Sequence, residues 1–274
     1  MLPTLFISHG APNVALYDSP ARRFMESYGA TLPKPKAILS VSAHFMTEAP
    51  VVIADEHPGM IYDFGGFERE LYEKVYPAPG EPELARLVAE RLISTGLEAH
   101  LAVDRGYDHG TWVPLSLIYP QADIPVVQLS IQPRLDPAHH FHVGQALQGL
   151  AAEGVLVMAS GSITHNLGEV FDRKRGGLVP RDAPPAPWAV EFTEWFTARL
   201  EAGAVADLLD YRRLAPHAVR SHPTDDHLLP IFVALGAAGE GLRTEHVHAS
   251  GQYGSLMMDA YAFHPAAEDV RRVA

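Results

Sequence analysis

Short apolar runs alternate with amphipathic segments along most of the chain. Residues 4–8, 37–43, 125–131 and 154–160 are nearly continuous runs of apolar and small side chains, a pattern typical of parallel strands buried on both faces. Further strands are predicted at residues 50–54, 98–103, 243–249 and 255–263, and helices at residues 20–29, 67–76, 81–96, 137–154, 187–203 and 225–239. This alternation predicts an α/β fold, a three-layer sandwich with a central, mostly parallel sheet, mixed at its edges, and helices on both faces.

The length and composition of the chain bound the number of domains. The 274 residues, of which 47% are hydrophobic and 20% charged, are enough to bury one sizeable core. The stretch 172–187 is rich in Gly, Pro and charge and resembles a linker, but the histidines on both sides of it favour a mobile loop within one domain. We therefore expect a single domain over residues 1–274.

The charge and the histidine content exclude some classes of binding partner and restrict the ligands of any metal site. The formal net charge is −12 and no run of Lys or Arg occurs, which argues against binding to nucleic acid or to an anionic membrane. No apolar run approaches the roughly 20 residues of a membrane span, and the N-terminus lacks the basic region of a signal peptide, so we expect a cytoplasmic protein. Cysteine is absent whereas histidine occurs 15 times. Any transition-metal site must therefore consist of histidines and carboxylates.

Histidines follow three of the predicted strands. Residues 4–8 run into His9, residues 37–43 into His44, and the strand at 154–160 leads through small residues to His165. In an open α/β sheet, ligands bind in the crevice outside the carboxyl ends of the strands. A single histidine in such a place is most often an ordinary polar residue, but three in the same position relative to a strand favour a shared site.

Two further histidines are candidates for this site. His227 precedes a predicted helix, where Asp225 or Asp226 could cap or orient it, and His222 competes with it for the role. His109 lies in a Gly-flanked segment with Asp108 and Trp112 beside it, which suits an active-site loop and an ordinary turn about equally.

The remaining histidines form weaker patterns. His246 and His248 share one face of a predicted strand, as in some zinc sites, and remain a rival ligand pair. The histidines within 138–142 lie at a helix start, where we expect their side chains to be solvated. The chain has no Gly-x-Ser-x-Gly, Gly-Lys-Ser/Thr, His-Glu-x-x-His or Gly-x-Gly-x-x-Gly motif, so these alternatives to a strand-end metal site receive no support.

A series of short motifs resembles one family of metal enzymes. They occur in the order "SHGAP", "SAHF", "DFGGF", "YPAPG", "GYDHGTW", "PVVQLSI", "SGSITHNL" and "HPTDDHLLP". This order is similar to that of the class III extradiol ring-cleavage dioxygenases, in particular the LigB-like, DOPA-dioxygenase-type branch, and the resemblance extends from residue 5 to about residue 260.

The resemblance implies a role for each of five histidines. The metal ligands of the family fall on His9, His44 and His227. The resemblance thus favours His227 over His222. The histidine of the His-Asn-Leu motif falls on His165, which the family uses as the catalytic acid/base and which can also join the metal shell. The Asp-His-Gly histidine falls on His109, which resembles the second active-site histidine near the oxygen and the substrate.

The resemblance also implies one divalent metal ion as cofactor. Better known class III enzymes use two histidines and a glutamate, whereas this branch has a third histidine, His227. Fe(II) is the metal that the dioxygenase activity requires, but three or four imidazoles also bind zinc well, so we expect Zn(II) in the protein as isolated. Gly168 follows the His-Asn-Leu motif where many relatives have Arg, which indicates a changed contact with the substrate.

The activity implied by the resemblance is the opening of a catechol-type ring, such as that of DOPA, by insertion of O2 beside the diol. His165 would accept a phenolic proton and His109 would stabilise the reacting oxygen or donate a proton. Phe64, Trp112 and Tyr253 are candidates for the aromatic wall that binds the substrate. The expected partners are thus a small aromatic molecule and O2, with a homodimer as the candidate assembly.

Two other functions are compatible with the same histidines. A zinc-dependent hydrolase would use them to activate a bound water molecule. A non-catalytic metal-binding protein, similar to the Memo relatives of the superfamily, would keep the histidines without turning over a substrate.

Overall fold

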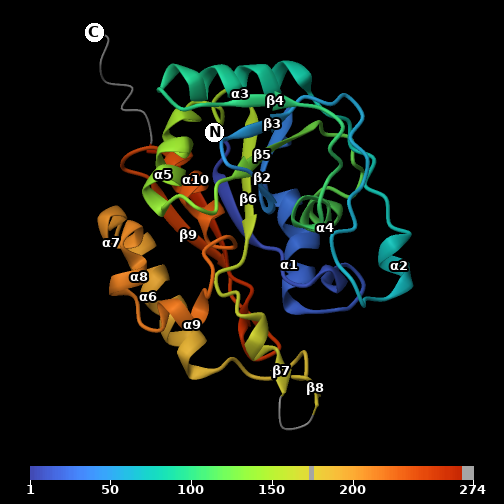
Figure 1. The fold of residues 1–274 in the computed structure, drawn as a ribbon, viewed down its shortest axis with the longest axis vertical. Coiled ribbons are helices and arrows are strands. Elements are labelled where there is room, and N and C mark those ends of the chain that lie inside the picture. The colour runs from blue at the N-terminus through green and yellow to red at the C-terminus, as the bar shows by residue number, and fades with distance from the viewer. Residues whose placement is uncertain (173–175, 267–274) are drawn as a thin grey trace.

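The computed structural model describes residues 1–172 and 176–266 and is built around an eight-stranded sheet (Figure 1). The strands follow the order β4 (His100–Ala102), β3 (Val51–Ile53), β5 (Val126–Ile131), β2 (Ala37–Met46), β6 (Val155–Gly161), β1 (Thr4–Ser8), β12 (Ala260–His264) and β9 (Arg243–His248). Two further pairs of short strands lie outside it, β7 (Phe171–Asp172) with β8 (Gly177–Leu178) and β10 (Gly251–Gln252) with β11 (Leu256–Met257).

The centre of the sheet is parallel and its edges are mixed, as predicted. Strands β5, β2, β6 and β1 pair in parallel, with Ser42 opposite Ser160 and Ser8 opposite Gly161. On one side β12 and β9 run antiparallel, and on the other β3 is antiparallel to β5 and parallel to β4. All residues of β1, β5 and β6 are buried because helices cover both faces.

The helices form a layer on each face of the sheet (Figure 1). Side chains of α1 (Pro20–Tyr28) and α4 (His109–Ile118) pack on one face, and those of α3 (Pro82–Ser94), α5 (Pro137–Ala146), α6 (Pro187–Glu201) and α10 (Leu229–Ala238) on the other. The remaining helices are short: α2 (Arg69–Tyr72), α7 (Val205–Leu209), α8 (Tyr211–Leu214), α9 (Ala218–Ser221) and the 3-10 turns Pro12–Ala15, Gly29–Thr31 and Leu167–Glu169.

Several predicted helix boundaries were wrong for identifiable reasons. The helix expected at 67–76 is the single turn α2, which ends at Tyr72; Pro77 disfavours helical geometry in Tyr76 and so accounts only for the last residue of the expected helix. The helix expected to continue to residue 154 ends at Ala146, and a positive φ follows at Gly149. The helix expected from residue 225 begins at Leu229, with Pro230 in its first turn, the one place in a helix where proline fits well.

The loop at 172–187, the membrane spans, the domain count, the location and the assembly were also predicted from the sequence. The stretch 172–187 contains β8 and the start of α6, while residues 173–175 of it lie outside the described part. None of the helices in residues 1–172 and 176–266 is both long and apolar enough to cross a membrane. The single domain, the cytoplasmic location and the homodimer stay predictions.

Candidate metal centre and active site

The carboxyl ends of β1, β2 and β6 bring the strand-end histidines together. His9 directly follows β1, and its backbone N–H donates to the carbonyl of Gly161 at the end of β6, 3.0 Å away. His44 was expected to follow the strand, but it lies inside β2. The register of β2 against β5 shifts between Val41 and Met46. His227 precedes α10. Its backbone carbonyl accepts from the N–H of Ser162, the residue after β6, at 2.8 Å, and this hydrogen bond holds it beside that strand.

His9, His44 and His227 approach one another through their Nε2 atoms. Nε2 of His44 lies 3.2 Å from Nε2 of His9 and 3.2 Å from Nε2 of His227. The rings of His9 and His227 are 5.4 Å apart, centroid to centroid. His9 and His227 are almost fully buried, while His44 is half-buried at the cavity. Nε2 of His44 therefore lies beside the Nε2 atoms of both other histidines, and all three residues line one cavity.

The other ring nitrogen of His9 is held by a hydrogen bond that fixes the tautomer. Nδ1 of His9 lies 2.9 Å from Oγ of Ser160, and the hydroxyl of Ser160 donates to the carbonyl of Gly110. Since that hydroxyl proton is already engaged, Oγ accepts from Nδ1–H of His9 and the lone pair is left on Nε2. This is the orientation that partner groups impose on metal-binding histidines.

A carboxylate plays the same part for His227, and another lies near His44. Nδ1–H of His227 donates to Oδ2 of Asp226, and Nδ1 of His44 lies 3.4 Å from Oδ2 of Asp63. The sequence left Asp225 and Asp226 as alternatives, and the structure places Asp226 on the histidine. Asp225 instead accepts from the hydroxyl of Tyr211 at 2.7 Å.

The donor set fits a divalent transition metal. Neutral imidazole is the form that binds a metal; burial, above all, lowers the pKa of His9 and His227 well below the usual value and that of His44 to about 3. Three lone pairs directed at one point repel one another unless a cation lies between them. Tetrahedral zinc with bonds of about 2.0–2.1 Å to nitrogen separates its ligand atoms by about 3.3–3.4 Å, close to the 3.2 Å contacts at His44.

Possible metal-binding groups in the described part of the chain coincide with this cluster. One consists of His9, His44 and His109 and the other of His165, Asp226 and His227, with the ligand atoms of each group within 4.8 Å of one another. The contact between His44 and His227 joins the two groups into one centre.

His109 is fixed beside this centre by Asp63. Oδ1 of Asp63 accepts from the backbone N–H of His109 at 3.0 Å and from its Nδ1–H at 2.8 Å, and the ring of His109 lies 3.9 Å from that of His44. Although burial raises the pKa of Asp63, the hydrogen bonds and charge of His109 outweigh it and lower that pKa to about 2. The contact of this aspartate, the first residue of the "DFGGF" motif, with His109 is not predictable from the motif itself.

The segment around His109 is a helix and not the expected loop. His109 is the first residue of α4, and the side chain of Asp108 caps the helix by accepting from the N–H of Thr111 at 3.1 Å. The sequence pattern did not predict this helix because it contains Gly110 and Pro114, and both residue types usually break helices. The cap is the signal that could have revealed it.

His165 stacks on the ring of His227, with the centroids 3.4 Å apart and the planes at 7°. No side-chain hydrogen bond to its ring nitrogens is found among the described residues, and its backbone N–H donates to Ser221. Burial lowers the pKa of His165 to about 4, so the ring is neutral near pH 7.

The histidines line a cavity of about 380 Å³. Besides the five histidines and Asp63, its walls include Met46, Phe64, Phe67, Leu167 and Leu256. Phe64 meets the ring of His109 edge to face at 5.7 Å, so it places an aromatic ring in the lining of the cavity.

Trp112 and Tyr253 do not line this cavity, contrary to expectation. Trp112 is fully buried in α4, where its indole N–H donates to Ile61 at 3.3 Å and its ring lies 6.3 Å from that of Phe64. It supports the wall from behind. Tyr253 is buried in a small cluster with Val170 and Leu256, one residue removed from the cavity.

The other histidines lie elsewhere. His222 is fully buried and its Nε2 lies 2.9 Å from the carbonyl of Ile163, away from the centre. Nε2 of His246 pairs with Asp259, and that of His248 with Ser250, so neither belongs to a metal-binding group of the described residues. The expectation of solvated side chains at 138–142 was wrong for His140, which is 1% exposed.

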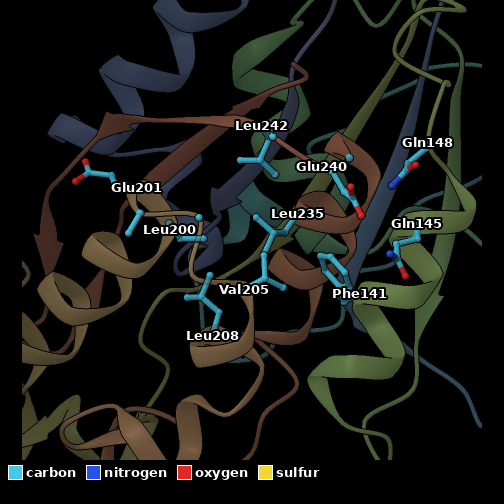
Figure 2. Close-up of a pocket in the computed structure, with 14 residues that line it drawn as sticks. Phe141, Gln145, Gln148, Leu200, Glu201, Val205, Leu208, Leu235, Glu240 and Leu242 are labelled. Atoms are coloured by element: carbon cyan, nitrogen blue, oxygen red, sulfur yellow. The ribbon is translucent and has the colours of Figure 1, made fainter. Parts of the chain in front are cut away.

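A second cavity holds none of the predicted site residues. It has a volume of about 410 Å³ and lies between α5, α10 and the α6–α7 region (Figure 2). Its floor is apolar, with Phe141, Leu200, Leu208 and Leu235 pointing toward one another. The polar residues Gln145, Gln148, Glu201 and Glu240 also line it.

The fold and the histidine cluster define an α/β protein with an open site that can hold a divalent metal ion. A family model described as the catalytic LigB subunit of aromatic ring-opening dioxygenase matches residues 3–263. The chain belongs to this LigB family and is an extradiol ring-cleaving dioxygenase, an oxidoreductase.

Individual relatives agree with this assignment. The 4,5-DOPA dioxygenase extradiol of Beta vulgaris is 43% identical over 264 residues, covering 95% of this chain and 96% of the relative. The protein of the same name from Escherichia coli (strain K12) is 40% identical over 245 residues, covering 86% and 85%. The crystal structure of an uncharacterized protein from Escherichia coli K12 matches with a TM-score of 0.78 and 34% identity, covering 96% of this chain and 99% of that one.

Proposed function

We propose that the protein opens the ring of a catechol-type substrate such as DOPA beside its diol, using one divalent metal held by His9, His44 and His227. The observation that carries this proposal is the convergence of three Nε2 atoms, at 3.2 Å from His44 to each of the others, at the floor of a cavity with an aromatic wall. The names of the relatives support the choice of substrate class.

Fe(II) is the metal proposed for activity, since it supplies the electron density that O2 needs to react with an aromatic ring. Zn(II) has no redox chemistry, and the Irving–Williams order favours it over Fe(II) in a site of imidazoles. We therefore expect zinc in protein purified without added iron.

His165 is the proposed acid/base. Its ring is neutral because burial lowers its pKa to about 4, and its stacking on His227 places it within reach of a substrate bound at the centre. It would accept the phenolic proton of the diol at a ring nitrogen and return a proton later in the reaction.

His109 is proposed to act on the other side of the centre. Because its Nδ1–H donates to Asp63, its Nε2 is the atom left for the cavity. From there it would hydrogen-bond to the reacting oxygen or deliver a proton. The wall formed by Phe64, Phe67 and Leu256 would hold the ring of the substrate and exclude water from the reacting carbon.

The test is to load the metal-free protein with Fe(II) under nitrogen, add DOPA or another catechol, and then admit air. The proposal expects a yellow ring-opened product with Fe(II) and none with Zn(II). If no catechol gives a ring-opened product, the proposed substrate class is wrong. A zinc-dependent hydrolase would instead act on esters or amides without O2, and no observation on the structure favours it or the non-catalytic alternative.

A further inference from the structure

Arg181 stands just outside the lining of the histidine cavity. Its backbone carbonyl accepts from the N–H of Tyr253 at 3.0 Å, and its Nε–H donates to the hydroxyl of Tyr253 at 3.4 Å. Tyr253 in turn packs against Leu256 and Ala11, which both line the cavity. The arginine is thus separated from the cavity wall by a single side chain.

The guanidinium of Arg181 is also held in a defined plane. It lies over the ring of Tyr17, 3.8 Å from the centroid, and the hydroxyl of Tyr17 donates to Glu68. A guanidinium held by Nε on one aromatic residue and by its face on another has a defined plane. Such a pre-organised fork suits a carboxylate, which it can bind with two parallel hydrogen bonds.

Other arginines beside the cavity are already paired with carboxylates. Nη2 of Arg105 lies 2.7 Å from Oδ2 of Asp108, and Nε of Arg220 lies 2.9 Å from Oε1 of Glu169. No ion pair of Arg181 is found among the side chains that the structure describes, a set that leaves out residues 172–175 and 267–274. The described lining of the cavity also contains neither Lys nor Arg, so a cation that pairs with an anionic substituent has to come from beyond the lining.

We propose that Arg181 binds the carboxylate of the substrate and makes the enzyme selective for catechols that carry an acidic side chain. This inference rests on the proposed function, because it requires a catechol ring at the histidine centre. The ring would lie against Phe64, and the side chain would leave past Leu256 toward the guanidinium. Tyr253 then acts as the support of Arg181 and not as part of the expected aromatic wall.

The test compares 3-(3,4-dihydroxyphenyl)propionate with its methyl ester, which differ in charge but share the ring and the chain length. Arg181→Gln should raise KM for the acid about ten- to hundredfold, the loss expected of charged hydrogen bonds, with kcat and the KM for the ester nearly unchanged. Arg181→Lys, which keeps the charge but not the fork, should recover part of the loss. Arg69→Gln, at an exposed arginine paired with Glu73 on α2, is the matched control and should behave as the wild type.

Binding to the Fe(II) protein under nitrogen gives a second readout that does not depend on turnover. The Kd of the acid should rise in Arg181→Gln by the same factor as KM, while the Kd of the ester stays constant. Equal changes for acid and ester, or a wild-type enzyme without preference for the acid, would overturn the assignment of Arg181. If the wild type opens neither compound, the proposed function fails instead, so the two failures are distinguishable.

Discussion

One carboxylate, that of Asp63, links the two sides of the centre. Its Oδ1 accepts both N–H groups of His109, at 3.0 and 2.8 Å, and its Oδ2 lies 3.4 Å from Nδ1 of His44. A proposed metal ligand and a proposed catalytic histidine therefore take their orientation from a single side chain in the "DFGGF" loop.

Asp63→Asn should lower activity through this orientation. An amide lacks the charge that faces Nδ1 of His44 and stabilises the Nδ1–H donor of His109, and the loss of such a partner costs about ten- to hundredfold in metal affinity or activity. Steady-state kinetics with saturating Fe(II) should show the loss mainly in kcat. Glu70→Gln, on the neighbouring turn α2 and outside the cavity, is the control; an equal loss in both variants would contradict the role of Asp63.

His165→Ala separates an acid/base from a metal ligand. If His165 moves protons, turnover should fall by about 10²–10⁴ while the metal content stays at one ion per chain. Metal analysis of the purified variant beside its kinetics checks this. Loss of the metal together with activity would instead make His165 a required ligand.

The choice between His227 and His222 can be tested in the same way. His227→Ala should lose the metal, because its Nε2 is one of the three converging atoms. His222→Ala should keep the metal but lower Tm, since it leaves a cavity and removes the hydrogen bond to the carbonyl of Ile163. The opposite pair of results would show that the third ligand was misassigned.

The pH dependence of stability should report His140, which is remote from the centre. Its Nε2 accepts from the N–H of Gln132 at 3.1 Å, its Nδ1–H donates to the carbonyl of Asp136 at 2.9 Å, and burial lowers its pKa to about 4. Below pH about 6.5 the unfolded chain takes up a proton here that the folded protein does not, so the free energy of unfolding falls as the pH decreases toward 4.

The variant His140→Gln should reduce that slope by about 1 kcal/mol per pH unit. Glutamine can still accept from Gln132 but does not titrate. Denaturant unfolding of metal-free protein between pH 6.5 and 4.5 measures the effect. Parallel pH curves for wild type and variant would show that His140 is not held neutral by the fold.

Much of the fold was predictable because buried parallel strands leave continuous apolar runs, as at 4–8 and 154–160. The same rule led to the gathering of His9, His44 and His165 at one edge. The wrong predictions concerned features that depend on tertiary packing, which local sequence patterns do not show. Helix α4 contains two residues that normally break helices, and the burial of Trp112 depends on what packs over it.

The partners of the histidines were harder to predict than the histidines themselves. Ser160 and Asp63 reach His9 and His109 from segments that are distant in the chain, so no spacing rule reveals them. Asp226 was foreseen only as one of two neighbours, because adjacency in sequence does not decide which carboxylate faces the ring.

The central claim is that the enzyme inserts both atoms of O2 beside the diol of a catechol. The most direct test is to run the Fe(II)-loaded enzyme with DOPA under oxygen-18 gas and to trap the product rapidly, before its aldehyde oxygen exchanges with water, for mass spectrometry. The account predicts a ring-opened product that carries two oxygen-18 atoms. A product whose added oxygen comes from water, or the absence of ring-opened product, would contradict it.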